Sequence, residues 1–192
     1  MQPLVLASTS PYRKELLQRL GLKFITAAPH IDESRRLAES PEQLVRRLAE
    51  EKAHVVAKKF SDALIIGSDQ VAVMGKEVLT KPGTHENAVG QLQRCSGQTV
   101  TFVTGLCLLN ARTGKAQSEV IPFRVHFRSL NATQIENYLR REQPYDCAGS
   151  FKSEGLGIAL FDRLEGDDPA ALIGLPLIRL TRMLETEGIQ VI

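Results

Sequence analysis

The order of the first elements is set by residues 3–14, which read PLVLASTSPYRK. The apolar run Pro3–Ala7 predicts a buried strand, and the proline at position 11 predicts the start of a helix. Three hydroxyls, Ser8-Thr9-Ser10, and two adjacent cations, Arg13-Lys14, follow where the strand passes into the helix. The N–H groups and the positive dipole end of such a helix favour an anion. The segment therefore indicates a phosphate site, although a capped helix with solvated cations has the same pattern.

Along the rest of the chain, apolar runs alternate with segments of helical periodicity. The expected strands are 24–28, 63–67, 100–110, 117–128 and 158–161, with a small hairpin over 71–79. The expected helices begin after Ser40 and Asn131, after the segment Lys81–Thr84, and at Pro176. This order of strands and helices predicts an α/β fold with a mixed twisted sheet and helices on both faces.

Size and charge narrow the class of protein. The chain has 192 residues and a formal net charge of +2. This small charge gives no reason to expect binding to a polyanion or to a membrane surface. With only 5% aromatic residues and no interleaved basic and aromatic run, nucleic acid is not an expected partner. The three cysteines show no paired spacing, and residues 1–6 form no signal peptide, so we expect a cytoplasmic protein.

Two carboxylates are candidates for holding a metal. The apolar run 63–67 predicts a central strand that places Ser68-Asp69-Gln70 at its end, where open α/β sheets bind their ligands. Glu33 lies in the polar loop after the second expected strand. Hard oxygen ligands suit Mg²⁺ or Mn²⁺, whereas the four scattered histidines show no zinc spacing. Either carboxylate alone is compatible with a solvated loop.

Three lysines could neutralise a phosphate. Lys52 falls inside the apolar stripe of the helix after Ser40, where it either extends to the helix edge or points inward to a phosphate or to Asp69. Lys81 precedes a proline, and Lys152 lies between two glycines, so both are in loops that can aim a charge. Together with Arg13 and a metal, three lysines would suffice to neutralise a triphosphate.

The motifs, in this order and spacing, resemble those of the Maf family of nucleotide pyrophosphatases. The resemblance rests on short runs that span nearly the whole chain: Leu6–Pro11 with Arg13, Asp32-Glu33, Glu51-Lys52-Ala53, Gly67-Ser68-Asp69, Thr80-Lys81-Pro82 and Gly149–Gly155. It implies one elongated α/β domain over residues 1–192, with a cleft between two lobes and often assembled as a homodimer. It also implies hydrolysis of a nucleoside triphosphate between its α and β phosphates, with a divalent cation, Mg²⁺ or Mn²⁺.

Roles follow from the resemblance position by position. Asp69 would be the general base, and Glu33 would assist it in holding the metal. The phosphates would be held by Arg13, Lys52 and Lys81, with Ser8 and Ser10 lining the phosphate loop. An aspartate is ordinarily ionised at neutral pH, and positioning with charge neutralisation supplies most of the rate enhancement in such transfers.

Three positions indicate which nucleobase the substrate carries. The family branch that cleaves dTTP and UTP has arginine, threonine and glutamine where this chain has Tyr12, Gln70 and Glu154. A tyrosine face stacks on a purine, and more strongly on a cationic ring such as 7-methylguanine. A carboxylate accepts the N–H groups at the edge of guanine. Tyr12, Gln70 and Glu154 together resemble the family branch that hydrolyses 7-methyl-GTP. Lys152 would either contact the substrate or support Glu154.

Other readings stay open from the sequence. The same enzyme class could act on dTTP and UTP, or broadly on modified nucleotides. A protein of another class would bind nucleotides and regulate cell division without turnover. A general α/β phosphatase would release orthophosphate in place of pyrophosphate.

Overall fold

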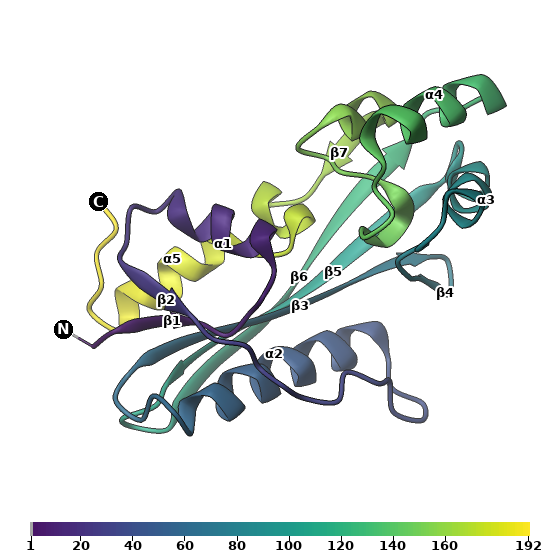
Figure 1. Cartoon of the computed structure of the whole chain (residues 1–192). Helices are drawn as coiled ribbons and strands as arrows, with labels where there is room; N and C mark the ends of the chain where they lie inside the picture. The colour runs from purple at the N-terminus through teal and green to yellow at the C-terminus, as the bar shows by residue number, and fades with distance from the viewer. Residues whose placement is uncertain (1) are drawn as a thin grey trace. The chain divides into compact units, whose positions relative to one another are not determined.

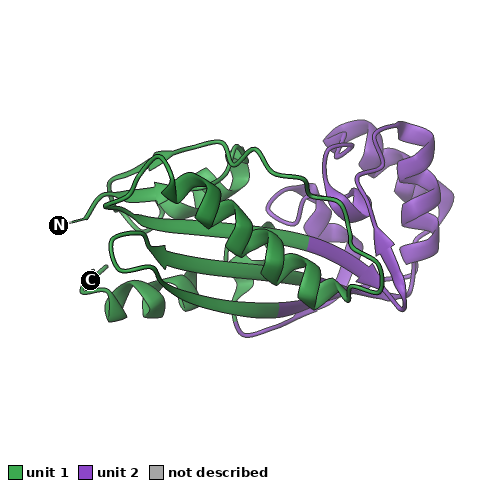
Figure 2. Cartoon of the chain, turned by 90° about the horizontal axis from the view of Figure 1, so that it is seen from below, with its two compact units in different colours: residues 1–70, 103–121, 168–192 green, residues 71–102, 122–167 purple. Residues whose placement is uncertain are grey.

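The computed structural model describes residues 2–192, and it divides the chain into two compact units (Figure 2). The first unit comprises residues 1–70, 103–121 and 168–192, and the second comprises residues 71–102 and 122–167. Within the described residues, seven strands form one mixed sheet in the order β2-β1-β3-β5-β6-β7, with β4 paired to β3 (Figure 1). The α/β fold with a mixed sheet is confirmed.

The first unit begins with β1 (Leu4–Leu6), α1 (Pro11–Gln18), β2 (Phe24–Thr26) and α2 (Pro41–Ala57). Strand β1 pairs in parallel with β2 on one side and with β3 (Leu64–Met74) on the other. The 3-10 turn η3 (Pro169–Ile173) and α5 (Leu177–Thr186) complete the unit. Figure 1 shows α2 on one face of the strands and α1 and α5 on the opposite face.

The second unit contains the β3–β4 hairpin, with β4 at Glu77–Leu79, followed by α3 (His85–Cys95). Helix α4 (Ala132–Glu142) and the short 3-10 turns η1 (Ala148–Ser150) and η2 (Leu156–Leu160) lead to β7 (Phe161–Glu165). The long strands β5 (Thr99–Asn110) and β6 (Lys115–Phe127) contribute residues to both units. The second unit contains a group of edge-to-face aromatic pairs, which involve Phe102, Phe127, Phe151 and Phe161.

Most helix starts lie where their capping residues predict them. Ser40 accepts from the backbone N–H of Gln43, and the Gln43 side chain accepts from the Ser40 backbone, which is a complete capping box. Asn131 and Gln134 form the same reciprocal pair at α4. Ser10 caps α1 with Pro11 at its first position, as its sequence indicates.

Two strand predictions are wrong in their bounds. The expected strand 63–67 continues to Met74, so Ser68, Asp69 and Gln70 lie inside β3 and not beyond its end. The polar residues are tolerated within the strand because their side chains are hydrogen-bonded to the protein. The expected strand 158–161 is mostly the 3-10 turn η2, and β7 begins at Phe161, where the prediction ended.

No helix within residues 2–192 combines the length and the apolar character needed to cross a lipid bilayer. The cytoplasmic location, the homodimer, the absence of a nucleic-acid partner and the single domain over residues 1–192 stay predictions.

Candidate active site

The side chains of β3 alternate between two environments, as the period of two in a strand requires. Asp69 faces α2, where it contacts Lys52. Its neighbours face the opposite way, toward the turn η3. The Ser68 hydroxyl lies 2.8 Å from the Gly105 carbonyl oxygen and 2.9 Å from that of Gly174. The Gln70 amide donates to the carbonyl oxygens of Ala171 and Leu172. Strand β3 therefore presents one acidic group to α2 and fastens η3 with its other face.

Helix α2 approaches the sheet closely because two strand positions lack a side chain. A Cβ atom at Gly67 would collide with the carbonyl oxygen of Ala49, and one at Gly105 would collide with that of Val45. Glycine within a strand commonly marks such a close approach of another backbone. The contact brings Lys52, one turn beyond Ala49, against the strand that carries Asp69.

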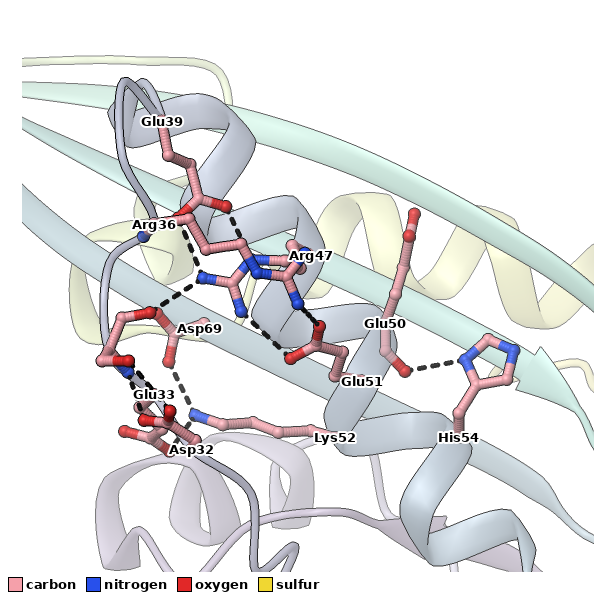
Figure 3. A network of polar contacts seen from close by, with 11 residues as sticks. Asp32, Glu33, Arg36, Glu39, Arg47, Glu50, Glu51, Lys52, His54 and Asp69 are labelled. Atoms are coloured by element: carbon pink, nitrogen blue, oxygen red, sulfur yellow. Dashed lines mark hydrogen bonds and ion pairs between the residues drawn. The ribbon is translucent and has the colours of Figure 1, made fainter.

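Lys52 lies between two carboxylates (Figure 3). Its ammonium nitrogen is 2.6 Å from Asp69 Oδ1 and 2.7 Å from Glu33 Oε1. The side chains of Lys52 and Asp69 are 5% and 11% exposed, whereas that of Glu33 is 57% exposed. Of the two readings of Lys52, the structure selects the inward one. An ammonium has three N–H donors, so one donor is left for a ligand after these two contacts.

Arg13 adds a second cation to this group. It lies in the first turn of α1, and its Nε donates to the carbonyl oxygen of Gly174 at 2.8 Å. Desolvation lowers the pKa of Arg13 below its ordinary value, and the charges of Asp69 and Glu33 act in the opposite direction. An anionic ligand would give this desolvated guanidinium a further partner of opposite charge.

The segment between β1 and α1 has the geometry of a capped helix start. The Ser8 side chain is buried, and its oxygen accepts from the Ser10 backbone N–H at 3.1 Å. The Ser10 oxygen accepts from the Arg13 backbone N–H at 3.4 Å. Tyr12 is half-buried in the first turn of the same helix. The first unit thus brings together four predicted residues with opposite charges, namely Arg13, Glu33, Lys52 and Asp69, with the serine segment at the start of the Arg13 helix.

An ion-pair network, which the sequence analysis did not anticipate, holds the loop that carries Glu33 (Figure 3). Arg47 of α2 binds both carboxylate oxygens of the buried Glu39, at 2.6 and 2.9 Å. It also donates to the Ser34 carbonyl oxygen at 3.0 Å and to Glu51 at 3.1 Å. The hydrogen bond from Arg47 lowers the pKa of Glu39 to about 2. The network fixes residues 34–39 against α2, next to Glu33.

The remaining predicted ligands belong to the second unit. Lys81 is exposed in the segment between β4 and α3, and Lys152 follows η1. The backbone N–H of Lys152 donates to the Tyr138 hydroxyl at 3.1 Å. Glu154 is exposed, and its carboxylate accepts from the Ser153 hydroxyl at 3.3 Å. For Gln70, in the first unit, the bonds to η3 commit the amide nitrogen to the protein, and its contact with substrate stays a prediction.

The residues that position these groups were not recognised as such from the sequence, although Gly67 is part of one of the quoted motifs. Two glycines, Gly67 and Gly105, allow the close approach of α2, and the Gly174 carbonyl oxygen accepts from Arg13. The ion pair of Arg47 with Glu39 holds the loop that carries Glu33. A signal existed for Gly67 and Gly105, because each glycine interrupts an otherwise apolar strand. The pairing of Arg47 with Glu39 had none, since it joins a loop to a helix eight residues away.

Comparison with known proteins identifies the family. The model of the Maf-like protein family matches residues 3–187. The chain belongs to this family. A Nitrosococcus oceani protein named 7-methyl-GTP pyrophosphatase is 63% identical over 98% of this chain and 95% of its own length. Proteins of the same name from Pseudomonas fluorescens and Methylobacillus flagellatus are 58% and 56% identical, and each match covers the whole of both chains. The resemblance read from the motifs is confirmed.

A solved structure supports the fold alone. The Staphylococcus aureus Ham1 protein superimposes with a TM-score of 0.55, covering 97% of this chain and all of that chain, at 12% identity. At this identity, the likeness is evidence for a shared α/β architecture and carries nothing about the site.

Proposed function

We propose that this member of the Maf-like family hydrolyses 7-methyl-GTP between its α and β phosphates, releasing the nucleoside monophosphate and pyrophosphate. The chain is a hydrolase that acts on nucleotide anhydrides, as its relatives at 56–63% identity are named. The observation that carries the chemistry is Lys52, buried between Asp69 and Glu33, with Arg13 near enough for both carboxylate charges to act on it.

Asp69 is proposed as the general base. Its carboxylate sits on a central strand and is held on one oxygen by Lys52, so its direction is fixed by the sheet and not by a mobile loop. A water molecule would give its proton to Asp69 as its oxygen attacks phosphorus. The bond between that phosphorus and the oxygen bridging the α and β phosphates would then break. The pyrophosphate takes the bridging oxygen with its electron pair.

Arg13 and Lys52 are proposed to bind the phosphates. Lys52 has a third N–H donor beyond its two carboxylate contacts, and the guanidinium of Arg13 has donors beyond the Nε that binds Gly174. The backbone N–H groups at the start of α1 would add neutral donors, with Ser8 and Ser10 beside them. We propose that Lys81 contributes a further positive charge to the phosphates.

A divalent cation is proposed because the cluster lacks net charge. Arg13 and Lys52 are offset by Glu33 and Asp69, so these four groups sum to zero while a triphosphate is highly negative. The residues fit Mg²⁺ or Mn²⁺: such ions take one or two protein carboxylates and complete their shell with water and phosphate oxygens. When bound, the metal would neutralise charge on the transferred phosphoryl group.

We propose that four residues recognise the nucleobase of the substrate: Tyr12, Glu154, Gln70 and Lys152. The Tyr12 ring would stack on the cationic purine, and Glu154 would accept its N–H edge. Neither dTTP nor UTP offers a cationic ring or a pair of edge donors, so both should be poorer substrates.

The test is release of pyrophosphate and monophosphate from 7-methyl-GTP, GTP, dTTP and UTP, with Mg²⁺, with Mn²⁺ and with a chelator. Preferred turnover of 7-methyl-GTP that the chelator abolishes supports the proposal in full. Preference for dTTP and UTP would refute the base assignment and retain the enzyme class. Orthophosphate as the first product would refute cleavage between the α and β phosphates.

A further inference from the structure

Two segments of the second unit carry predicted substrate ligands. The first, residues 80–84, contains Lys81 and leads into α3. The second, residues 147–155, contains η1 and the ligands Lys152 and Glu154. Neither segment contains a strand or an α-helix, and side chains of the neighbouring helices hydrogen-bond to both backbones. The side chain of Gln91 contacts both segments.

Gln91 lies on α3 and is buried. Its amide nitrogen donates to the Thr80 carbonyl oxygen at 3.0 Å, directly before Lys81. Its amide oxygen accepts from the Ser150 hydroxyl, two residues before Lys152. A primary amide offers a donor and an acceptor at one end of a side chain, so a single residue can join two backbone segments.

The Ser150 end of this link is the more constrained. Ser150 is fully buried and has a positive φ of 61°, a conformation that non-glycine residues rarely adopt. Its hydroxyl has no water to replace a lost partner, whereas Thr80 is exposed and its carbonyl can be hydrated. Loss of Gln91 should therefore release both segments and affect the Ser150 segment more.

Other contacts secure each segment separately. Asn87 donates to the Pro82 carbonyl oxygen at 2.9 Å, and the Gly83 N–H donates to the Tyr145 carbonyl oxygen at 3.0 Å. Tyr138 of α4 accepts from the Lys152 N–H, and Glu142 accepts from the Leu156 N–H at 2.8 Å. The Gly83–Tyr145 bond ties the first segment to the turn just before the second, whereas the Gln91 side chain hydrogen-bonds to both segments themselves.

We propose that Gln91 is a positioning residue that sets the placement of Lys81 relative to Lys152 and Glu154. The inference rests on the proposed function, because it assigns Lys81 to the phosphates and Glu154 to the base. Gln91 itself touches no substrate. Its role is to keep a phosphate ligand and a base ligand at the separation that one nucleotide requires.

Three variants separate the two ends of the link. Gln91→Leu removes both hydrogen bonds, and Ser150→Ala removes only the one to η1. Gln91→Glu, when ionised, retains an acceptor for Ser150 but cannot donate to Thr80; when protonated, it again offers a donor and an acceptor. Gln93→Leu, at an exposed position of the same helix, is the matched control.

Hydrogen–deuterium exchange tests the positioning without any substrate. In Gln91→Leu, peptides covering residues 79–84 and 147–155 should exchange several-fold faster than in the wild type, whereas Ser150→Ala should affect the second peptide alone. The Gln93→Leu control should leave both unchanged. Unchanged exchange in both peptides of a folded Gln91→Leu protein would overturn the proposal, whatever the enzyme's substrate is.

Steady-state kinetics with 7-methyl-GTP and GTP test the functional consequence. Because a displacement of about 1 Å can cost about 100-fold, Gln91→Leu should lower kcat/KM by roughly 10- to 100-fold and reduce the preference for 7-methyl-GTP. Gln91→Glu should recover activity relative to the wild type as the pH is lowered from about 8 to about 6, because burial favours its protonated form. Faster exchange with unchanged kcat/KM and preference would overturn the role. Failure of the wild type to cleave 7-methyl-GTP would instead refute the proposed function, and the kinetic test then uses the nucleotide it does cleave.

Discussion

Replacing Lys52 by methionine tests the central ion cluster, because methionine keeps the apolar stem and removes the charge. In the wild type the Lys52 side chain is 5% exposed, and its ammonium nitrogen lies 2.6 Å from Asp69 Oδ1 and 2.7 Å from Glu33 Oε1. Removing one partner of a buried ion pair costs about 3–5 kcal/mol, because the other charge is left without compensation. Here the charges of Arg13 and Asp69 still attract each other, and Glu33 is 57% exposed and regains water. We therefore expect a loss of about 2–3 kcal/mol, which for a chain of this length lowers Tm by roughly 5–10 °C.

The double variant Lys52→Met/Asp69→Asn separates stability from activity. With both charges of the pair removed, its loss in unfolding free energy should fall short of the sum of the single variants by about 1–2 kcal/mol. Its activity should not recover, since each single variant is expected to lose about 10²- to 10³-fold in kcat. Thermal or urea unfolding and pyrophosphate release measure the two quantities on the same samples. Additive destabilisation, within about 0.5 kcal/mol, would refute the coupling of the two charges.

Two further predictions concern the residues that position the cluster. Arg47 lowers the pKa of Glu39 from 4.5 to about 2, so the stabilising effect of this pair is present above about pH 4.5 and is lost as the pH falls toward 2. The urea midpoints of the wild type and of Glu39→Gln should therefore differ at pH 7 and converge near pH 2. A difference that stays constant with pH would contradict the assignment. Gly67→Ala should lower the unfolding free energy by about 1–3 kcal/mol and reduce activity, because its Cβ would collide with the Ala49 carbonyl oxygen. The control is Gly90→Ala in α3, where the added Cβ meets no neighbouring atom within 4 Å. Measured by thermal unfolding, this control should be more stable than the wild type by about 0.5–1 kcal/mol.

Local signals in the sequence predicted the elements whose ends are encoded by neighbouring residues. The capping boxes at Ser40 and Asn131 and the proline at the start of α1 fix helix ends through bonds within four residues. The end of β3 is different, because a strand continues as long as a partner strand is available. Strand β1 stops opposite Ile66, but β5 is the other neighbour of β3 in the sheet and β4 pairs with residues 72–74. The strand therefore passes through Ser68, Asp69 and Gln70. A reading of apolar runs stops at the first polar residue and could not anticipate this pairing.

The candidate site shows the same contrast between residues with a local sequence signal and contacts between distant segments. Residue types and spacing identified Arg13, Glu33, Lys52 and Asp69, because their chemistry is visible in the chain itself. The contacts that orient them join distant segments. Gly174 receives Arg13 from α1, 161 residues earlier, and the bonds of Gln91 reach back 11 residues and forward 59. Such partners are ordinary residues by composition, and only the folded chain shows which of them meet.

Two of the motifs that identify the family are the two sides of one contact. In β3, Gly67 and Asp69 are two residues apart and share the face turned to α2. In α2, Ala49 and Ala53 are the small residues whose backbone meets Gly67, and Lys52 stands between them. The glycine brings the helix close, and the aspartate on the same face then reaches the lysine. Gly67-Ser68-Asp69 and Glu51-Lys52-Ala53 are therefore constrained together: a larger residue at position 67 would move Lys52 away from Asp69 with both charged residues still in the sequence.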